Sequence, residues 1–263
     1  MEFFDSHAHY NDEKFNDDRE EIIQKIYLSS VTRLINAGYS IKSSESAYEI
    51  AKKFDWMYTI SGISPNDIPE GEKELHIQLN KLANFINDKK ASKKIVAIGE
   101  IGLDYYWNKN NIDLQKEAFT RQIGIANSMD LPIVIHTREA IMDTLEILKK
   151  HQVVKKGVFH CCPLNRELVK EGLKLGFYIS FAGPITFKNS KNANEIIEMC
   201  PLDRILIETD SPYLSPEPNR GKRNDSRNVK YIAKKIAEVK NIELEKIAQI
   251  TYENAMRIFE INI

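Results

Sequence analysis

The stretch IVAIGEIGLDYYW, residues 95–107, does most to decide the fold of this chain. It opens with an apolar run at residues 95–98, of the kind that forms a buried strand, and then turns polar at Glu100. A carboxylate that closes a buried strand has to be paired or bound to a metal ion, because burying it alone is too costly. The stretch therefore predicts a chemically active group where a strand ends in a loop.

The same arrangement occurs at four further places along the chain. His136 closes PIVIH, His160 closes GVFH, and Asp210 follows RILIE. Near the N-terminus, FFDSHAH supplies His7 and His9, which face the same side of a strand because side chains alternate along it. Six ligand-type side chains at five strand ends predict a metal site that the fold assembles, and therefore an enzyme.

Apolar strand-like runs alternate with helical patterns along the chain, which is typical of a parallel sheet with crossover helices. Eight strands are expected, at residues 2–7, 31–37, 57–63, 95–100, 132–136, 157–160, 176–181 and 204–208. Helices are expected at residues 17–29, 44–54, 74–88, 112–128, 138–150, 165–174, 190–199, 226–239 and 243–260. Eight strand–helix units predict a (β/α)8 TIM barrel with the metal site at the C-terminal ends of the strands. The alternative, an open doubly wound sheet, does not make the first and last strands neighbours.

Size and composition favour one TIM-barrel domain covering residues 1–263, since such a barrel takes about 250 residues. Lys and Arg number 37 and Asp and Glu 38, which argues against a protein that coats nucleic acid nonspecifically. The three cysteines show no disulfide spacing, and neither a signal peptide nor an apolar run of membrane length is present. We therefore expect a cytoplasmic monomer with no membrane association and no obligate protein partner.

The sequence leaves other interpretations of the ligand-type residues open. Glu100 could form an ion pair with Arg138, and Asp210 could be a turn or helix-capping residue. One of the two N-terminal histidines could be a capping or core residue.

Four further residues of metal-binding type are not expected to be ligands. His76 and His151 lie in polar helical stretches and are expected on the surface. A thiolate–metal role for Cys161 and Cys162 is disfavoured, because adjacent side chains of an extended segment diverge and free cysteine is usually a small buried hydrophobe.

The motifs FDSHAH, AIGEIGLDYYW, PIVIHTREA, FHC, ETDSPYL and NRGKRN resemble, in this order, those of the TatD family of metal-dependent hydrolases. The resemblance runs from FDSHAHYND to TYENAMRIF and so covers essentially the whole chain. It implies divalent-metal-dependent DNase activity, often as a 3′–5′ exonuclease on single-stranded ends. The ligand sets that it implies are His7, His9, Glu100 and Asp210 for one ion, and Glu100, His136 and His160 for the other.

Two departures from the family pattern leave the metal ligands untouched. Many members carry histidines in a Gly-x-His-Pro-His string after the third strand, where this chain has Ser64 and Asn66. These side chains can hydrogen-bond a phosphate but cannot act as imidazoles. After RGKRN, members often have an acidic residue and proline, where this chain has Asp225 and Ser226. Both departures are expected to affect substrate preference and the rate of hydrolysis.

A basic loop and one arginine are expected to bind the substrate. The loop at residues 219–224 is the densest basic segment near the proposed site, although it could be an ordinary solvated loop. Arg138, two residues after His136, can reach a phosphate or orient Glu100. The aromatic residues 105–107 can stack a base or pack against the barrel rim. The predicted substrate ligands are Ser64, Asn66, Arg138, Arg220, Lys222, Arg223 and Asn224.

The leading hypothesis is a two-metal phosphodiester hydrolase that acts on single-stranded DNA ends with Mg²⁺, Mn²⁺ or Zn²⁺. Its catalytic residues are Glu100, which bridges the ions, and Asp210, which accepts a proton from water. The alternative is an amide, ester or aminoacyl-type hydrolase, although related barrels often place a modified lysine where this chain has Glu100. A non-catalytic metal- or nucleic-acid-binding scaffold is supported only by Ser64 and Asn66.

Overall fold

The computed structural model describes residues 1–261 and contains one sheet of eight parallel strands in the order β1 to β8. The strands are β1 (Phe3–Ala8), β2 (Val31–Ala37), β3 (Met57–Ser61), β4 (Ile95–Asp104), β5 (Ile133–Arg138), β6 (Gly157–Phe159), β7 (Tyr178–Phe181) and β8 (Ile205–Ile207). Beyond β8 the chain returns to β1. There the Asp210 N–H donates to the His7 carbonyl at 2.9 Å, and the His9 N–H donates to the Ser211 carbonyl at 2.6 Å. These bonds nearly close the sheet into a barrel.

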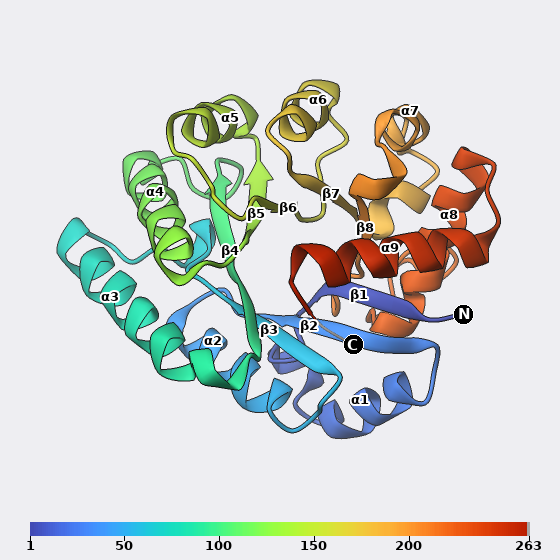
Figure 1. Ribbon diagram of the computed structural model, residues 1–263, viewed down its shortest axis with the longest axis horizontal. Helices are drawn as coiled ribbons and strands as arrows, with labels where there is room; N and C mark the ends of the chain where they lie inside the picture. Colours follow the sequence, from blue (N-terminus) through green and yellow to red (C-terminus); the bar gives the residue numbers. More distant parts are fainter. Residues whose placement is uncertain (262–263) are drawn as a thin grey trace.

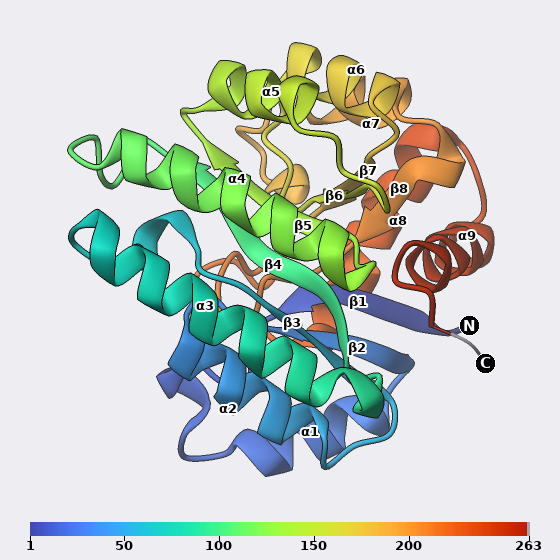
Figure 2. The same cartoon turned by 60° about the vertical axis from the view of Figure 1, so that its left-hand side comes forward.

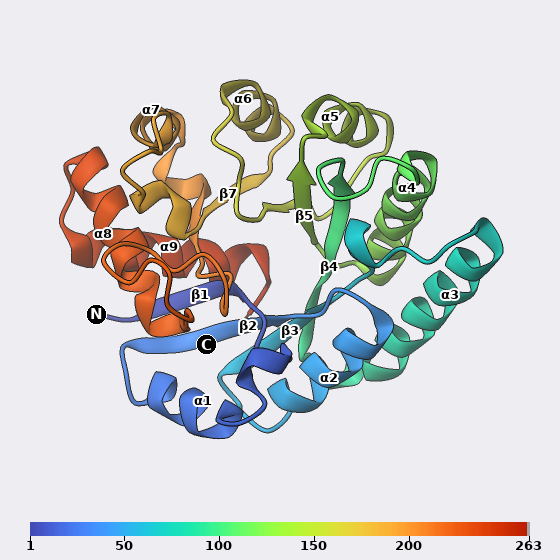
Figure 3. The same ribbon diagram turned by 180° about the vertical axis from the view of Figure 1, so that it is seen from behind.

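Helices alternate with the strands and lie around the outside of the sheet (Figures 1 and 3). They are α1 (Arg19–Tyr27), α2 (Ile41–Ala51), α3 (Glu72–Lys89), α4 (Ile112–Met129), α5 (Ile141–Lys150), α6 (Arg166–Lys174), α7 (Ala193–Met199), α8 (Val229–Lys240) and α9 (Leu244–Ile258). This arrangement confirms the predicted (β/α)8 barrel. Within residues 1–261, none of these helices combines the length and the hydropathy needed to cross a lipid bilayer.

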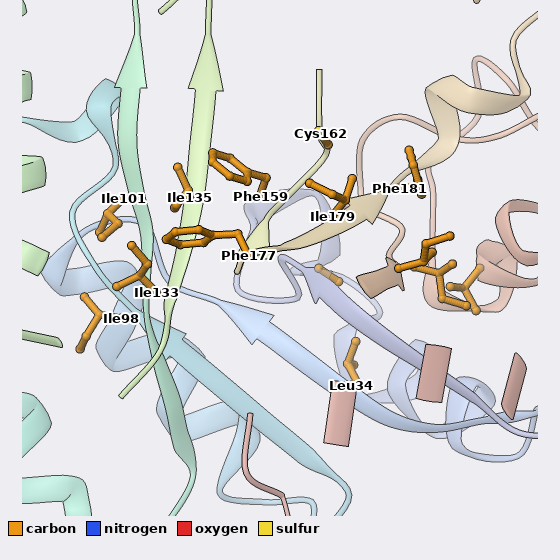
Figure 4. Packing of buried hydrophobic residues seen from close by; sticks show 14 of the residues in the cluster. Leu34, Ile98, Ile101, Ile133, Ile135, Phe159, Cys162, Phe177, Ile179 and Phe181 are labelled. Carbon is orange, nitrogen blue, oxygen red and sulfur yellow. The ribbon is translucent and has the colours of Figure 1, made fainter. Parts of the chain in front are cut away.

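The alternation of side chains along each strand separates two buried layers. On β5, Ile133 and Ile135 belong to the layer between the strands and the helices, whereas Val134 belongs to the layer inside the barrel. Figure 4 shows part of the outer layer, where the rings of Phe159 and Phe177 lie with their centroids 5.4 Å apart. Burial of these apolar side chains is the main driving force for folding.

Inside the barrel, each strand contributes apolar side chains to a second cluster, which α9 covers at one end. The strand residues include Phe4, Ile35, Ile60, Val96, Val134, Val158, Tyr178 and Leu206. Ala255 and Ile258 of α9 join them, and Asn254 of the same helix donates to the Ile205 carbonyl where β8 begins. Figures 1 and 2 show α9 beside β1, near the N-terminus of the chain. Apolar packing therefore seals the amino ends of the strands and leaves their carboxyl ends as the polar face.

The fourth strand is longer than the sequence predicts. It does not end at Glu100 but continues to Asp104, and its register against β5 shifts between Ile98 and Ile101. Gly102 makes this shift possible, because its φ is +138° and a Cβ there would lie 2.0 Å from the His136 carbonyl oxygen. Glu100 therefore does not end the strand. Its side chain lies on the face of β4 that is directed toward the other ligand-type residues.

Candidate metal centre

All six predicted ligands meet at the carboxyl ends of the strands. The alternation that builds the barrel interior places them there: His136 comes two residues after Val134, and His160 comes two residues after Val158. His7 and His160 are almost fully buried, and their rings stack with centroids 4.0 Å apart. The apolar layer inside the barrel therefore lies directly beneath the polar cluster.

The Glu100 carboxylate lies between two pairs of histidines. Its Oε2 atom is 3.5 Å from His7 Nε2 and 3.8 Å from His9 Nε2. Its Oε1 atom is 3.0 Å from His136 Nδ1 and 3.4 Å from His160 Nε2. One carboxylate therefore offers a separate oxygen to each pair. The predicted alternative, an ion pair of Glu100 with Arg138, does not form.

Asp210 completes the first of these groups. Its Oδ1 atom is 3.2 Å from His9 Nε2 and 3.8 Å from His7 Nε2. The residue is also part of a turn, since its φ is +55° and its carbonyl accepts the Tyr213 N–H at 2.9 Å. Asp210 therefore lies in a turn, and this turn aims its carboxylate at the histidines, as a metal ligand would require. We call His7, His9 and Asp210 the amino-terminal half of the centre, and His136 and His160 the central half.

The ring nitrogens that face away from Glu100 have different partners in the two halves. In the central half, His136 Nε2 donates to Asp104 Oδ2 at 2.9 Å. The Nδ1 atom of His160 donates to Glu208 Oε1 at 3.2 Å. In the amino-terminal half, His9 Nδ1 donates to a backbone carbonyl, that of Ala37, at 3.0 Å. These bonds fix the orientation of three of the four rings.

The two carboxylates of the centre are ionised at neutral pH. Burial alone would raise the pKa of Glu100, but the neighbouring His160 and His136 outweigh burial and hold that pKa well below its usual range. Burial opposes ionisation of Asp210 as well, and the hydrogen bond and charge of His9 lower its pKa in spite of it. Both groups are therefore available as anionic ligands.

The pKa values of two of the imidazoles shift in opposite directions. Burial lowers the pKa of His7, and the adjacent His160 lowers it further. Burial acts on His160 too, but Glu100 and Glu208 outweigh it and raise the pKa of His160 well above its usual value. A divalent ion would replace the proton on His160 as the positive charge facing these carboxylates.

The donor set fits divalent metal ions. The Nε2 atoms of His7 and His9 are 3.2 Å apart, and His136 Nδ1 lies 3.3 Å from His160 Nε2, so donors converge in pairs. Four imidazoles with two carboxylates suit Zn²⁺ and Mn²⁺, and Mg²⁺ through the carboxylates. Three groups of three donor atoms lie within 4.8 Å of one another: His7, His9 and Glu100; Glu100, His136 and His160; and His7, His160 and Asp210.

Comparison with known proteins decides the family. A family model described as TatD related DNase matches residues 4–260. The chain belongs to the TatD family of metal-dependent hydrolases. The metal-dependent hydrolase YabD of Bacillus subtilis is 43% identical over 260 residues, which cover 98% of this chain and 99% of YabD. The metal-dependent hydrolase YcfH of Escherichia coli is 43% identical over 173 residues, or 65% of each chain.

Solved structures of TatD proteins share the fold. YJJV, a TatD homolog from Escherichia coli, superposes with a TM-score of 0.91 at 24% identity, covering 99% of this chain and 98% of YJJV. A TatD family hydrolase from Entamoeba histolytica gives a TM-score of 0.85 at 22% identity, with 98% of both chains covered. The predicted family and barrel are both confirmed.

Ser64 and Asn66, where many TatD proteins have histidines, lie beside the centre in different settings. Ser64 is buried, and its hydroxyl donates to Asp67 Oδ2 at 2.7 Å. Asn66 is exposed, and its amide lies 3.4 Å from Asp104 Oδ2, the oxygen that accepts from His136. Of the two, Asn66 has the more accessible side chain.

The cations of the basic loop differ in their contacts. Arg220 and Lys222 are exposed, as is Arg138 across the barrel at the end of β5. Arg223 instead forms an ion pair with Asp18 and donates to the Lys14 carbonyl at 2.7 Å. In these contacts the Arg223 guanidinium holds the loop against the segment before α1, and its binding of substrate stays a prediction.

Asn224 also has a structural role. It is fully buried, and its amide donates to the carbonyls of Thr209 at 2.9 Å and Tyr213 at 2.7 Å. The residue therefore holds the chain on both sides of Asp210 in place. A direct contact of Asn224 with substrate stays a prediction.

Three buried carboxylates that support the centre are missed by the sequence analysis: Asp5, Asp104 and Glu208. Asp5 accepts the Thr209 N–H at 2.9 Å across the barrel closure, and burial raises its pKa to about 7. For Glu208 the available signal is spacing, since it follows Leu206 of the inner layer by two residues, so that alternation indicates the inner face. For Asp5 alternation gives no such signal, because the register of β1 shifts between Asp5 and Ala8.

The remaining histidines and cysteines lie outside the centre. His151 is exposed, as expected, whereas His76 is half-buried and pairs with Glu117 at 2.5 Å. Glu72 joins these two as a further group of potential metal donors between α3 and α4. Burial raises the pKa of the Cys161 and Cys162 thiols well above the usual value, which agrees with their exclusion as thiolate ligands.

Proposed function

We propose that this TatD family protein is a two-metal phosphodiesterase that removes nucleotides from the ends of single-stranded DNA. The observation that carries the proposal is the position of the Glu100 carboxylate, because its two oxygens face two separate pairs of histidines. In two-metal hydrolases, paired ions about 3.5–4 Å apart clamp the oxygens of a phosphoryl group. A carboxylate placed in this way is the expected bridge.

Each half of the centre would hold one ion. His7, His9 and Asp210 would bind the first together with Glu100 Oε2, and His136 and His160 would bind the second together with Oε1. Divalent ions bound there polarise a phosphoryl group and promote ionisation of water near neutral pH. Mg²⁺, Mn²⁺ and Zn²⁺ are the candidate ions.

Asp210 is the proposed acceptor of a proton from the attacking water. Its carboxylate is ionised, because His9 lowers its pKa, and its position is fixed by the backbone bond to His7. Asn224 and the turn hold the same segment from the other side. Asp210 can therefore remove a proton without first moving.

A phosphate-containing substrate is supported by the cations at the rim. Arg138 is two residues beyond His136 on β5, and Arg220 and Lys222 lie on the loop after β8, the strand that leads into Asp210. All three are exposed, and guanidinium and ammonium groups are the usual ligands of a phosphate backbone. With a formal net charge of −1, binding would depend on this rim and not on the whole surface.

Digestion from the 3′ end, and activity as a cytoplasmic monomer without a protein partner, extend the proposal by resemblance to the family. An amide, ester or aminoacyl substrate is the competing proposal for the same centre. Glu100 stands where barrels of that kind often carry a modified lysine, and the cationic rim suits a phosphate better than a neutral amide.

The test is a time course on 5′-labelled single-stranded DNA with Mg²⁺ or Mn²⁺, beside a chelated control. We expect a descending ladder that disappears with chelator and is lost in Asp210→Asn. His151→Ala, which alters an exposed histidine outside the centre, is the matched control and should digest at the unaltered rate. Faster turnover of an amide or ester panel than of DNA would contradict the proposal.

A further inference from the structure

Two exposed aromatic side chains follow β4 at the rim of the metal centre. Tyr106 is 49% exposed and Trp107 is 68% exposed, and their rings meet edge to face with centroids 4.9 Å apart. Aromatic side chains of this size usually lie largely buried, because exposing them to water is unfavourable. Two adjacent exposed rings next to a polar site are typical of a binding surface.

Arg138 contacts both rings and lies two residues beyond His136 of the central half. Its guanidinium carbon lies 3.7 Å from the centroid of the Tyr106 ring and 5.6 Å from that of Trp107. Arg138 is two residues beyond His136 on β5, so both side chains leave the same face of the strand, about 6 to 7 Å apart along it. One face of Tyr106 is covered by the arginine, and Trp107 is left as the more open ring.

The backbone beneath these rings is fixed by Asp104, which also contacts a predicted metal ligand. Asp104 Oδ1 accepts the Tyr106 N–H at 2.9 Å and the Trp107 N–H at 3.2 Å. Its other oxygen, Oδ2, accepts from His136 Nε2 at 2.9 Å. Asp104 is fully buried, and its own N–H donates to Gln115 at 2.9 Å. The aromatic pair is therefore held in a fixed position relative to His136, and it is not a free loop tip.

The other exposed aromatic side chains are less suited to stacking. The Tyr27 ring, on α1, stacks against Trp56 with centroids 5.4 Å apart. The Tyr213 ring is 42% exposed, but the Lys14 ammonium lies 4.1 Å above it and its hydroxyl donates to Asp12 at 2.6 Å. Trp107 is thus the most open aromatic face beside the centre.

We propose that Trp107, supported by Tyr106 and Arg138, is a platform on which an unpaired base of single-stranded nucleic acid stacks while its backbone enters the metal centre. The proposal rests on the phosphodiesterase function proposed above and names the substrate feature that this rim recognises. Every base presents a π-face, so such a platform accepts any sequence. A base inside a duplex is already paired and stacked, so the platform favours single strands.

Trp107 can report directly on base stacking. The chain has two tryptophans, and Trp56 is 8% exposed beneath Tyr27, so Trp56→Phe leaves Trp107 as the sole tryptophan. This variant is titrated with a thymidine oligonucleotide, first with chelator and then with Ca²⁺, while anisotropy of a labelled copy measures binding separately. We expect saturable quenching of Trp107, and about fivefold to a hundredfold weaker binding, without quenching, for an abasic oligonucleotide of equal length.

Unchanged Trp107 fluorescence under both conditions would overturn the proposal, whether or not anisotropy shows binding. Equal affinity for the abasic oligonucleotide would overturn it as well. Either result leaves the phosphodiesterase function to be judged on its own test.

Kinetics separate the two proposals. In Trp107→Ala we expect the KM for single-stranded DNA to rise about fivefold to a hundredfold with a smaller change in kcat. Tyr27→Ala removes an exposed aromatic ring on α1, away from the centre, and is the matched control, with thermal melting confirming the fold of both variants. Kinetics of Trp107→Ala equal to those of the control would contradict the platform alone, whereas unaltered protein without any metal-dependent hydrolysis would contradict the proposed function.

Discussion

The two halves of the metal centre share Glu100 but are supported in different ways. In the central half, the outer nitrogens of His136 and His160 both donate to buried carboxylates. In the amino-terminal half, His9 donates to a backbone carbonyl, and among residues 1–261 His7 Nδ1 has no hydrogen-bond partner. A carboxylate behind a histidine fixes the ring and makes it a stronger base, whereas a carbonyl mainly fixes it.

The difference indicates unequal sites. The central half is the more basic, so we expect it to bind its ion more tightly at neutral pH and to lose it more steeply in acid. The amino-terminal half depends on Asp210, for which we propose a second role as proton acceptor, so we expect its ion to exchange more easily. Four variants or conditions test this comparison.

Removing the shared ligand should have the largest effect. Glu100→Gln takes the anionic bridge from both halves at once, so we expect both ions to bind weakly and hydrolysis to fall at least about a hundredfold to a thousandfold. Metal content by mass spectrometry and the DNA time course measure the two losses. Glu245→Gln, which alters an exposed carboxylate on α9 at the sealed end of the barrel, is the control. Retention of one full ion in Glu100→Gln would show that the carboxylate serves a single half.

Acid should separate the halves. Burial lowers the pKa of His136, but Asp104 and Glu100 outweigh it, so its pKa is raised, as is that of His160. Metal binding requires neutral rings, so two protons must leave the central half, and its affinity should fall about a hundredfold per pH unit below those pKa values.

In the amino-terminal half only one ring binds its proton more tightly than usual. Asp210 raises the pKa of His9 against the effect of burial, whereas burial lowers that of His7. The affinity of the amino-terminal half for its ion should therefore fall about tenfold per pH unit. Calorimetric titration with Mn²⁺ between neutral and mildly acidic pH measures both slopes. Two equal slopes would contradict the assignment of unequal halves.

Weakening one supporting carboxylate should affect one half. Asp104→Asn keeps the size of the side chain but removes the charge behind His136, so we expect the central half to bind its ion about tenfold to a hundredfold more weakly. Affinity in the amino-terminal half should remain unchanged. Calorimetry resolves the two sites, and a parallel loss in both would mean that Asp104 acts on the whole centre through the fold.

The smallest effect is expected at the rim. Lys222→Ala removes one exposed charge on the loop after β8. We expect it to weaken oligonucleotide binding a few-fold and to reduce the slope of log affinity against log salt concentration by about one. Lys246→Ala, an exposed lysine on α9 at the sealed end of the barrel, is the control. Equal behaviour of the two variants would remove the loop from the substrate path.

Most of the fold follows from periodicity in the sequence. Apolar runs and helical patterns identify eight strand–helix units, because each strand buries both faces and each helix only one. The exception is β4, which continues to Asp104 where the sequence predicts an end at Glu100. In β4 the polar residues face the metal centre while the backbone stays paired with β5. The sequence of β4 alone does not show that pairing.

The residues that gather at the candidate centre can be predicted because they occur where apolar runs give way to polar residues. The supporting carboxylates cannot be distinguished in this way, since Asp104 and Glu208 look like ordinary loop residues beside a ligand. The structural contacts of Arg223 and Asn224 cannot be predicted from the local sequence either. Their partners Asp18 and Thr209 are brought to them by barrel closure and loop packing, which a local basic motif does not encode.

The most direct test of the central claim is anomalous diffraction from crystals of the protein grown with Mn²⁺. We predict two anomalous peaks, one beside each carboxylate oxygen of Glu100, with His7, His9 and Asp210 around the first and His136 and His160 around the second. A single peak, or peaks that do not touch Glu100, would contradict the shared two-ion centre.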